Sequence, residues 1–211
     1  MKSVSSARAV SELPVSPERE LERLRKVAKA CRACPLWKRA TQTVFGEGKA
    51  DAAAMLIGEQ PGNDEDLQGR PFVGPAGKLL DRALEEAGIG RERIYVTNVV
   101  KHFKWGPSGK RRLHKKPNAR EIAACRPWLE QEITLVKPRV ILCLGATAAQ
   151  ALLGAQFRVS RQRGEFVASP LARFVAATVH PSSILRAPDE ATRRIEFQKF
   201  VQDLKRIARV I

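Results

Sequence analysis

Residues 58–77 hold the densest set of reactive and shape-setting side chains in the chain. The stretch carries four carboxylates and one aromatic ring, Phe72, among repeated glycines and prolines. It follows a short apolar run, 52–57, and precedes a helical pattern, so it begins where a predicted strand ends. Open α/β sheets place their sites at the carboxyl ends of strands, and glycine and proline fix backbone shape. We therefore interpret the stretch as a functional loop, since an acidic surface connector would normally be shorter.

Polar side chains also follow two other predicted strands. Asn98 and the segment 101–105 come after one strand, and residues 180–186 follow the last one. An isolated Asn or His in a loop most often has only a structural role. The joint placement of three such strand ends at one sheet edge predicts a shared cleft.

The segment 101–116 is basic and partly aromatic. It contains seven Lys or Arg residues and no acidic residue, with Phe103 and Trp105 interleaved. This composition suits phosphate contact and base stacking, and its Gly-Pro-Ser-Gly centre predicts a flexible or turned loop. His114 lies between pairs of basic residues in this segment. Their charge is expected to lower its pKa and to favour neutral imidazole, which is a nucleophile.

Four cysteines raise the question of a metal centre. Cys31 and Cys34 form a Cys-x-x-Cys pair after the first predicted helix, a spacing that can hold a metal ion or a cluster. A disulfide is disfavoured because nothing indicates an oxidising compartment. Cys143 lies in an apolar run typical of a buried thiol, which leaves Cys125 and, as a fourth ligand, His102. Composition alone does not separate zinc from an iron–sulfur cluster.

The charge of the chain indicates a polyanionic partner. Its 211 residues include 38 Lys and Arg against 22 Asp and Glu, for a net charge of +16. Such an excess most often means nucleic acid. No apolar run is long enough to cross a membrane and the first residues lack a signal core, so we expect a cytoplasmic protein. We expect residues 1–16 to be a disordered tail and residues 17–211 to form one domain.

Alternating apolar runs and helical patterns predict the fold class. The predicted strands are 53–57, 94–99, 140–144 and 174–179. The predicted helices are 17–30, 76–87, 120–136, 147–153 and 189–209, and residues 157–167 read as a polar hairpin. This alternation is typical of a three-layer α/β/α domain with a central, mainly parallel four-stranded sheet.

From the Cys-x-x-Cys pair to the last helix, the chain resembles the iron–sulfur (family 4) uracil-DNA glycosylases, and specifically their UdgX branch. The motifs that carry the resemblance are Gly58-Glu59-Gln60-Pro61-Gly62, Gly69-Arg70-Pro71-Phe72-Val73-Gly74-Pro75-Ala76-Gly77, Thr97-Asn98, Lys110-Arg111-Arg112-Leu113-His114-Lys115 and His180-Pro181-Ser182-Ser183. Related enzymes outside the branch typically carry a cysteine where this chain has His102.

The resemblance implies a uracil-DNA glycosylase fold and excision of uracil from DNA, followed by a covalent bond between His114 and C1′ of the abasic sugar. It also implies a structural [4Fe–4S] cluster, for which we expect the ligands Cys31, Cys34, His102 and Cys125. The expected partner is uracil-containing DNA, with single strands favoured, and the protein is expected to be a monomer.

The residues fit roles in such a reaction. We expect His180 to stabilise the leaving uracil, Glu59 to counter sugar charge or orient His114, and Asp64 to position water or the loop. The uracil pocket is expected to comprise Gln60, Gly62, Phe72 and Asn98. The expected DNA contacts are Lys101, Lys110, Arg111, Arg112, Lys115, Ser182, Ser183 and Arg186.

Two alternatives stay open at the level of sequence. One is an ordinary turnover glycosylase, in which water captures the sugar. The other is a non-catalytic nucleic-acid-binding protein whose cluster or zinc ion senses redox state. Binding to a DNA backbone does not require the polar set of Glu59, Asn98 and His180, and this set favours an enzyme.

Overall fold

A five-stranded sheet forms the centre of the molecule, as seen in the computed structural model, which describes residues 16–109 and 111–211. The strands, in the spatial order β2–β1–β5–β7–β6, are Ile94–Asn98 (β2), Ala54–Gly58 (β1), Val140–Leu144 (β5), Phe174–Thr178 (β7) and Phe166–Val167 (β6). The pairs β2/β1, β1/β5 and β5/β7 are parallel, whereas β6 joins β7 antiparallel. The predicted mainly parallel sheet is confirmed, but the predicted strand number of four is wrong because β6 adds an edge strand.

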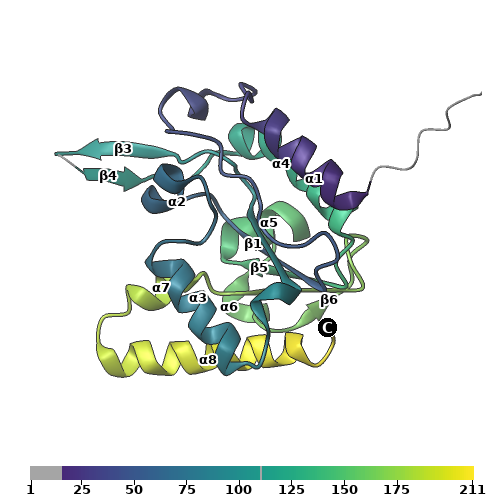
Figure 1. Ribbon diagram of the computed structural model, residues 1–211. Coiled ribbons are helices and arrows are strands. Elements are labelled where there is room, and N and C mark those ends of the chain that lie inside the picture. The colour runs from purple at the N-terminus through teal and green to yellow at the C-terminus, as the bar shows by residue number, and fades with distance from the viewer. Residues whose placement is uncertain (1–15, 110) are drawn as a thin grey trace, which may run out of the picture.

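Helices cover both faces of this sheet, which gives the three predicted layers (Figure 1). One face carries α1 (Pro17–Ala28), α4 (Ala119–Val136) and α5 (Ala146–Leu153). The other face carries α3 (Pro75–Glu86), α7 (Pro181–Leu185) and α8 (Glu190–Ala208). The remaining helical segments are α2 (Asn63–Gln68), α6 (Val159–Gln162) and two 3₁₀ turns, Pro35–Lys38 and Arg91–Arg93.

The sequence of β1 shows why two layers of helices are needed. Successive side chains of a strand point to opposite faces. Met55 and Ile57 pack into the cluster with α1, α4 and α5, whereas Ala54 and Leu56 pack into the cluster with α3 and α8. All four side chains are buried, as expected for a parallel strand covered on both sides.

The helix ends follow from local capping. The Ser16 hydroxyl accepts from the Arg19 N–H and Pro17 occupies the first helical position, which starts α1. Asn118 and Glu121 form a reciprocal capping box at the start of α4. Each predicted helix and strand is present with its ends within two residues of the expected positions.

Two segments differ from their sequence-based interpretation. The predicted hairpin over 157–167 is wrong: Phe157 and Val159 bury their side chains against the core, so the segment forms α6 and then β6. The basic segment is more ordered than a loop, because it pairs as an antiparallel hairpin of β3 (Trp105–Ser108) and β4 (Arg111–His114). This hairpin projects from the body of the molecule beside α2 (Figure 1).

The predictions for the chain ends can be compared with the structure only in part. The predicted tail over 1–16 lies outside the described residues except for Ser16, which caps α1. Within the described part of the chain, none of the helices has the length and apolar character that crossing a bilayer requires.

Candidate active site

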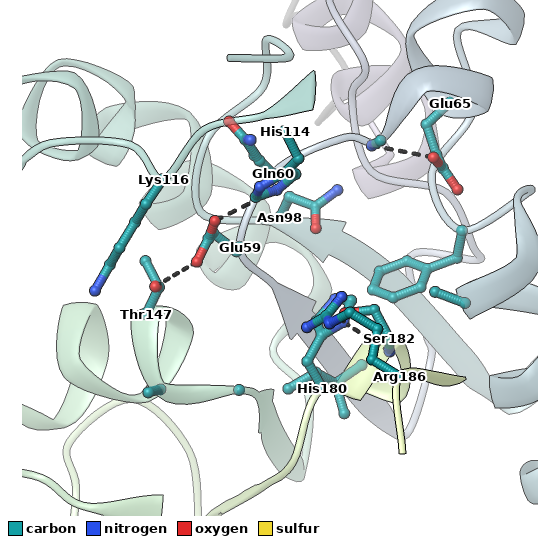
Figure 2. A pocket seen from close by; sticks show the side chains of 16 residues that line it. Glu59, Gln60, Glu65, Asn98, His114, Lys116, Thr147, His180, Ser182 and Arg186 are labelled. Atoms are coloured by element: carbon teal, nitrogen blue, oxygen red, sulfur yellow. Dashed lines mark hydrogen bonds and ion pairs between the residues drawn. The ribbon is translucent and has the colours of Figure 1, made fainter. Parts of the chain in front are cut away.

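A cavity of about 630 Å³ lies where the predicted functional segments meet (Figure 2). Its walls come from the residues after β1, the end of β2, the end of β4, the turn after β5 and the segment after β7. The lining residues are Glu59, Gln60, Gly62, Glu65, Phe72, Ala76, Asn98, His114, Lys116, Leu144, Gly145, Ala146, Thr147, His180, Ser182 and Arg186. The strand ends therefore converge on one cleft, as expected for an open α/β sheet.

Glu59 connects the hairpin to helix α5 across this cavity. Its Oε2 accepts a hydrogen bond from the Thr147 hydroxyl, and its Oε1 lies 3.5 Å from Nε2 of His114. Oε1 is buried and receives no hydrogen bond from the described residues. Figure 2 shows the carboxylate between these two partners. This arrangement places a negative charge directly beside the imidazole.

The pKa of His114 is lowered, which favours the neutral ring. Partial burial is the main cause, the Arg186 charge adds to it, and the Glu59 carboxylate opposes both. The sequence predicted the direction correctly but assigned the wrong cause, namely the adjacent Lys and Arg residues. Among those side chains, Arg112 is paired with Asp66, whereas Arg111, Lys115 and Lys116 are exposed. Arg186 comes from the segment after β7.

Two side chains hold the hairpin in place. The Gln60 carboxamide donates to the carbonyl oxygens of Lys104 and Lys115, at 3.2 and 3.1 Å, and accepts from the Lys104 N–H at 3.0 Å. Arg112 forms an ion pair with Asp66 at 2.6 Å. The Gln60 side chain therefore anchors the hairpin. Only the backbone of Gln60 is left for the predicted contact with the substrate. The guanidinium of Arg112, a predicted DNA contact, is likewise bound within the protein, by Asn63 and Asp66.

His180 is held as a neutral ring with a defined tautomer. The backbone N–H of Ser182 donates to Nδ1 at 3.1 Å, and the Ser182 hydroxyl lies 2.8 Å from the same atom. Because a backbone N–H can only donate, Nδ1 must accept, and the neutral ring carries its proton on Nε2. Burial, followed by the charges of Arg186 and His114, lowers the pKa of His180 to about 4. At neutral pH, His180 thus offers Nε2–H as a hydrogen-bond donor.

Phe72 and Asn98 both line the cavity and lie close to Gly58. The Phe72 ring stacks on His180 with 6.1 Å between centroids and 26° between planes. A Cβ at Gly58 would lie 2.4 Å from Oδ1 of Asn98 and 2.8 Å from the Phe72 ring, so only glycine leaves room for both. Likewise, a Cβ at Gly77 would lie 1.7 Å from the carbonyl oxygen of Phe72, whose own φ is 55°. These two glycines let the aromatic ring reach the cavity.

Among the loop carboxylates, Glu65 rather than Asp64 lines the cavity. Its oxygens accept from the N–H groups of Gly62 at 3.0 Å and Gly74 at 2.8 Å, which pins both ends of the loop. Asp64 accepts from the Asn63 side chain instead, at 3.1 Å. The sequence does not show which of the neighbouring carboxylates faces the cavity. The available signal was the spacing of Gly62 and Glu65, in which a glutamate three residues after the N-cap accepts from the N-cap N–H.

The comparisons with known proteins agree with this geometry. Residues 45–205 match the family model described as the uracil DNA glycosylase superfamily. The chain belongs to this superfamily. It is similar to the Type-4 uracil-DNA glycosylases of Thermotoga maritima (40% identical, covering 84% of this chain and 90% of the relative) and Pyrobaculum aerophilum (38%, covering 85% and 90%). A Type-5 uracil-DNA glycosylase of Thermus thermophilus is 30% identical, with 85% of each chain covered.

Six of the eight predicted DNA contacts fall into three groups. Ser182 and Arg186 line the cavity, as does Lys116, which the sequence analysis left out of the predicted contacts. Arg111, Lys115 and Ser183 are exposed nearby, while Lys110 lies outside the described residues. Phe103 is only 1% exposed and packs 6.1 Å from the His114 ring, so the base-stacking role expected for it is wrong.

Lys101 is a clear correction, because its side chain is 0% exposed and cannot contact DNA. Its ammonium group lies 2.5 Å from Oε2 of Glu132 and also donates to the Asn98 carbonyl at 2.8 Å. Glu132, on α4, also accepts from Tyr95 and Thr97. Lys101 therefore supports the strand end that carries Asn98. The basic residues around it in the sequence gave no sign of this structural role.

Replacing Lys101 with methionine is expected to destabilise the fold strongly. Removing one member of a buried ion pair leaves an uncompensated charge, at a cost of about 3–5 kcal/mol. Denaturant unfolding of Lys101→Met should show this loss, and the double variant Lys101→Met/Glu132→Gln should recover a large part of it. A single variant within about 1 kcal/mol of the wild type would be within the range of an ordinary surface substitution and would contradict this role.

The three predicted cluster cysteines of this glycosylase-superfamily chain lie within electrostatic reach of one another. Burial mainly raises the pKa of Cys34, and the charge of Cys31 adds to this. Burial likewise raises the pKa of Cys125 to about 11, with contributions from Cys34 and Cys31. N–H groups point at two of the sulfurs: Lys101 N–H donates to Cys125 at 3.1 Å and Trp128 Nε1–H to Cys31 at 3.3 Å.

The His102 ring has one nitrogen that is free to serve as the fourth ligand. Its Nε2 lies 2.9 Å from the Thr43 hydroxyl, while Nδ1 is buried with no hydrogen-bond partner among the described residues. Within the described ranges, no three His, Cys, Asp or Glu side chains converge as a single metal ion requires. The ligands of a four-iron cluster sit at separate corners, so they do not converge on one point. Three thiols and one imidazole are ligand types that iron–sulfur clusters take in proteins.

Proposed function

We propose that this protein is a uracil-DNA glycosylase that excises uracil and then remains bound through His114 to C1′ of the abasic deoxyribose, as in the UdgX branch. The observation that carries the proposal is the position of His114. Its neutral ring lies in the same cavity as Asn98 and His180, 3.5 Å from the Glu59 carboxylate. The printed names of the relatives, Type-4 uracil-DNA glycosylases, support the glycosylase activity itself.

We expect the base to be recognised by Phe72 and Asn98, which line the same cavity. The target nucleotide must leave the base stack before its glycosidic bond can be reached, so we expect single-stranded DNA to be the easier substrate. The Phe72 ring offers a stacking face, and the Asn98 carboxamide offers both a donor and an acceptor to the Watson–Crick edge. The described residues form no hydrogen bond with that carboxamide, which leaves it available to the base. Cytosine has its donor and acceptor reversed at two positions of that edge, so we expect it to be rejected.

Cleavage breaks the bond between C1′ and N1 of uracil, and its electron pair leaves with the base. Nε2–H of His180 donates a hydrogen bond to a uracil oxygen as negative charge develops there. The sugar becomes an oxocarbenium-like cation, and the Glu59 carboxylate lies near enough to offset that charge. The departing uracil anion takes a proton from water.

Capture forms a new bond between C1′ and an imidazole nitrogen of His114. The nitrogen supplies its lone pair, the ring becomes an imidazolium, and its N–H proton passes to water or to Glu59. The hairpin holds the imidazole in the cavity, so its effective concentration is high relative to a diffusing nucleophile. The resulting C–N bond lacks an easy leaving path unless the ring is protonated again, so the adduct persists.

A direct test of the activity uses single-stranded oligonucleotides that differ at one base. With protein in excess, the uracil oligonucleotide should release free uracil, measured by chromatography. Matched oligonucleotides with cytosine or thymine at that position should release no base. Absence of uracil release by the iron-loaded protein would refute the proposed glycosylase activity.

We further propose that Cys31, Cys34, Cys125 and His102 hold a [4Fe–4S] cluster with a structural role. A cluster at this place would tie the segment after α1 to α4 and to the residues after β2. It takes no part in the steps of the reaction given above.

The cluster proposal predicts equal amounts of iron and acid-labile sulfide in the purified protein. Cys125→Ala should lose most of both, because it removes a ligand. Cys143→Ala is the matched control: Cys143 lies within β5, and burial alone raises its pKa, with no contribution from another thiol. Stoichiometric zinc without sulfide, or a cluster lost in Cys143→Ala and kept in Cys125→Ala, would refute the assignment.

A further inference from the structure

Thr147 and His114 contact opposite oxygens of the Glu59 carboxylate. It is the second residue of α5, directly after the turn at Gly145, and its side chain is almost fully buried in the cavity wall. Deeper in a helix, a threonine hydroxyl can donate to the carbonyl of the preceding turn. In the first turn no such helical carbonyl exists, and the Thr147 hydroxyl instead donates to Oε2 of Glu59.

This hydrogen bond fixes which carboxylate oxygen faces the imidazole. With Oε2 held by Thr147, the other oxygen lies 3.5 Å from Nε2 of His114. Oε1 is buried and has no hydrogen-bond partner among the described residues, so no other contact there holds the carboxylate in this rotamer. Arg186 and Lys116 also line the cavity, and either cation would attract a carboxylate that was free to rotate.

We propose that Thr147 is a positioning residue that holds Glu59 against His114 and thereby favours capture of the sugar by the imidazole over capture by water. The inference rests on the proposed function. It concerns the partition of one intermediate between two nucleophiles, whereas the proposed function concerns whether the intermediate and the adduct form at all.

Two substitutions isolate the hydroxyl. Thr147→Val keeps the branched shape and removes the donor, whereas Thr147→Ser keeps the donor and removes a methyl group. Losing a hydrogen bond to a charged group corresponds to a fall in rate on the order of 10-fold or more. We therefore expect Thr147→Val to form the His114 adduct at least about 10-fold more slowly, with a larger share of the cleaved strand recovered as free abasic DNA. Thr147→Ser should stay close to the wild type in both measures.

The pH dependence of adduct formation separates positioning from packing. The charged and titratable groups facing His114 are Glu59, which raises its pKa, Arg186, which lowers it, and His180, whose own pKa responds to the His114 charge. Displacing the Glu59 carboxylate weakens its effect of raising the pKa of His114. The acid limb of the Thr147→Val profile should therefore shift to lower pH, while Thr147→Ser should keep the wild-type midpoint.

The experiment follows uracil release and the denaturation-resistant adduct in the same single-turnover reactions, for wild type and both variants, with thermal melting as a check of folding. Wild-type values for Thr147→Val, or equal defects in both variants, would overturn the inference. A parallel loss of release and adduct, with the adduct share and the pH midpoint unchanged, would also overturn it. If wild type releases uracil without any adduct, the proposed covalent capture fails, whatever the variants do.

Discussion

His114→Ser is expected to abolish the protein–DNA band that survives boiling in detergent while still releasing uracil. The substitution removes the only imidazole that the cavity presents beside Glu59, since the other cavity histidine, His180, is held by Ser182. The sugar cation can then be captured by water. We expect adduct formation to fall at least on the order of 100-fold, the effect of removing an aligned intramolecular nucleophile.

The control for this variant is its affinity for uracil-free single-stranded DNA, which should stay near that of the wild type because the basic residues around the hairpin remain. Wild-type adduct should also stay constant through neutral pH and decline only in acid. The reactive form of His114 is neutral, and burial lowers its pKa from the ordinary value of histidine, which favours this form at neutral pH. A surviving band in the His114→Ser lane would refute His114 as the point of attachment.

His180→Ala is expected to slow uracil excision by about 100-fold or more, the usual effect of removing one charge-stabilising donor. Its Nε2–H is the donor that the geometry holds ready, because Nδ1 is occupied by the Ser182 N–H. Burial keeps the ring neutral at physiological pH, with a pKa of about 4. The measurement is single-turnover uracil release with protein in excess.

Binding of uracil-free DNA should change little in His180→Ala, which separates a defect in chemistry from a defect in DNA affinity. A variant that excises uracil within a few-fold of the wild-type rate would remove His180 from the mechanism. His180 is also the stacking partner of Phe72. If its loss displaces the Phe72 ring, the variant should discriminate less strongly against cytosine.

The sheet and the layers of helices could be predicted from the sequence because their signals are local. Short apolar runs such as 140–144 are typical of strands that are covered on both faces of a sheet. Capping residues such as Asn118 mark where helices begin. The edge strand β6 was not predictable in this way. It has only two residues, and its pairing with β7 depends on where the preceding helix α6 packs.

The site residues also divide into those with a local sequence signal and those that depend on distant parts of the chain. Glu59, Asn98 and His180 lie within two residues of the ends of predicted strands, and the topology of the sheet brings them to one edge. The partners that orient them come from distant positions in the chain, as Thr147 does for Glu59 and Glu132 for Lys101. Lys101 shows why composition misleads: a lysine in a basic segment reads as a DNA contact until burial shows that it is paired inside.

The most direct test of covalent capture is the intact mass of the wild-type protein after incubation with a uracil-containing oligonucleotide and denaturation. We predict a species with the combined mass of the protein and the oligonucleotide minus uracil, in a yield approaching one per protein molecule. Digestion should map the modification to His114. Free uracil together with only unmodified protein, or a modification mapped to another residue, would contradict this prediction.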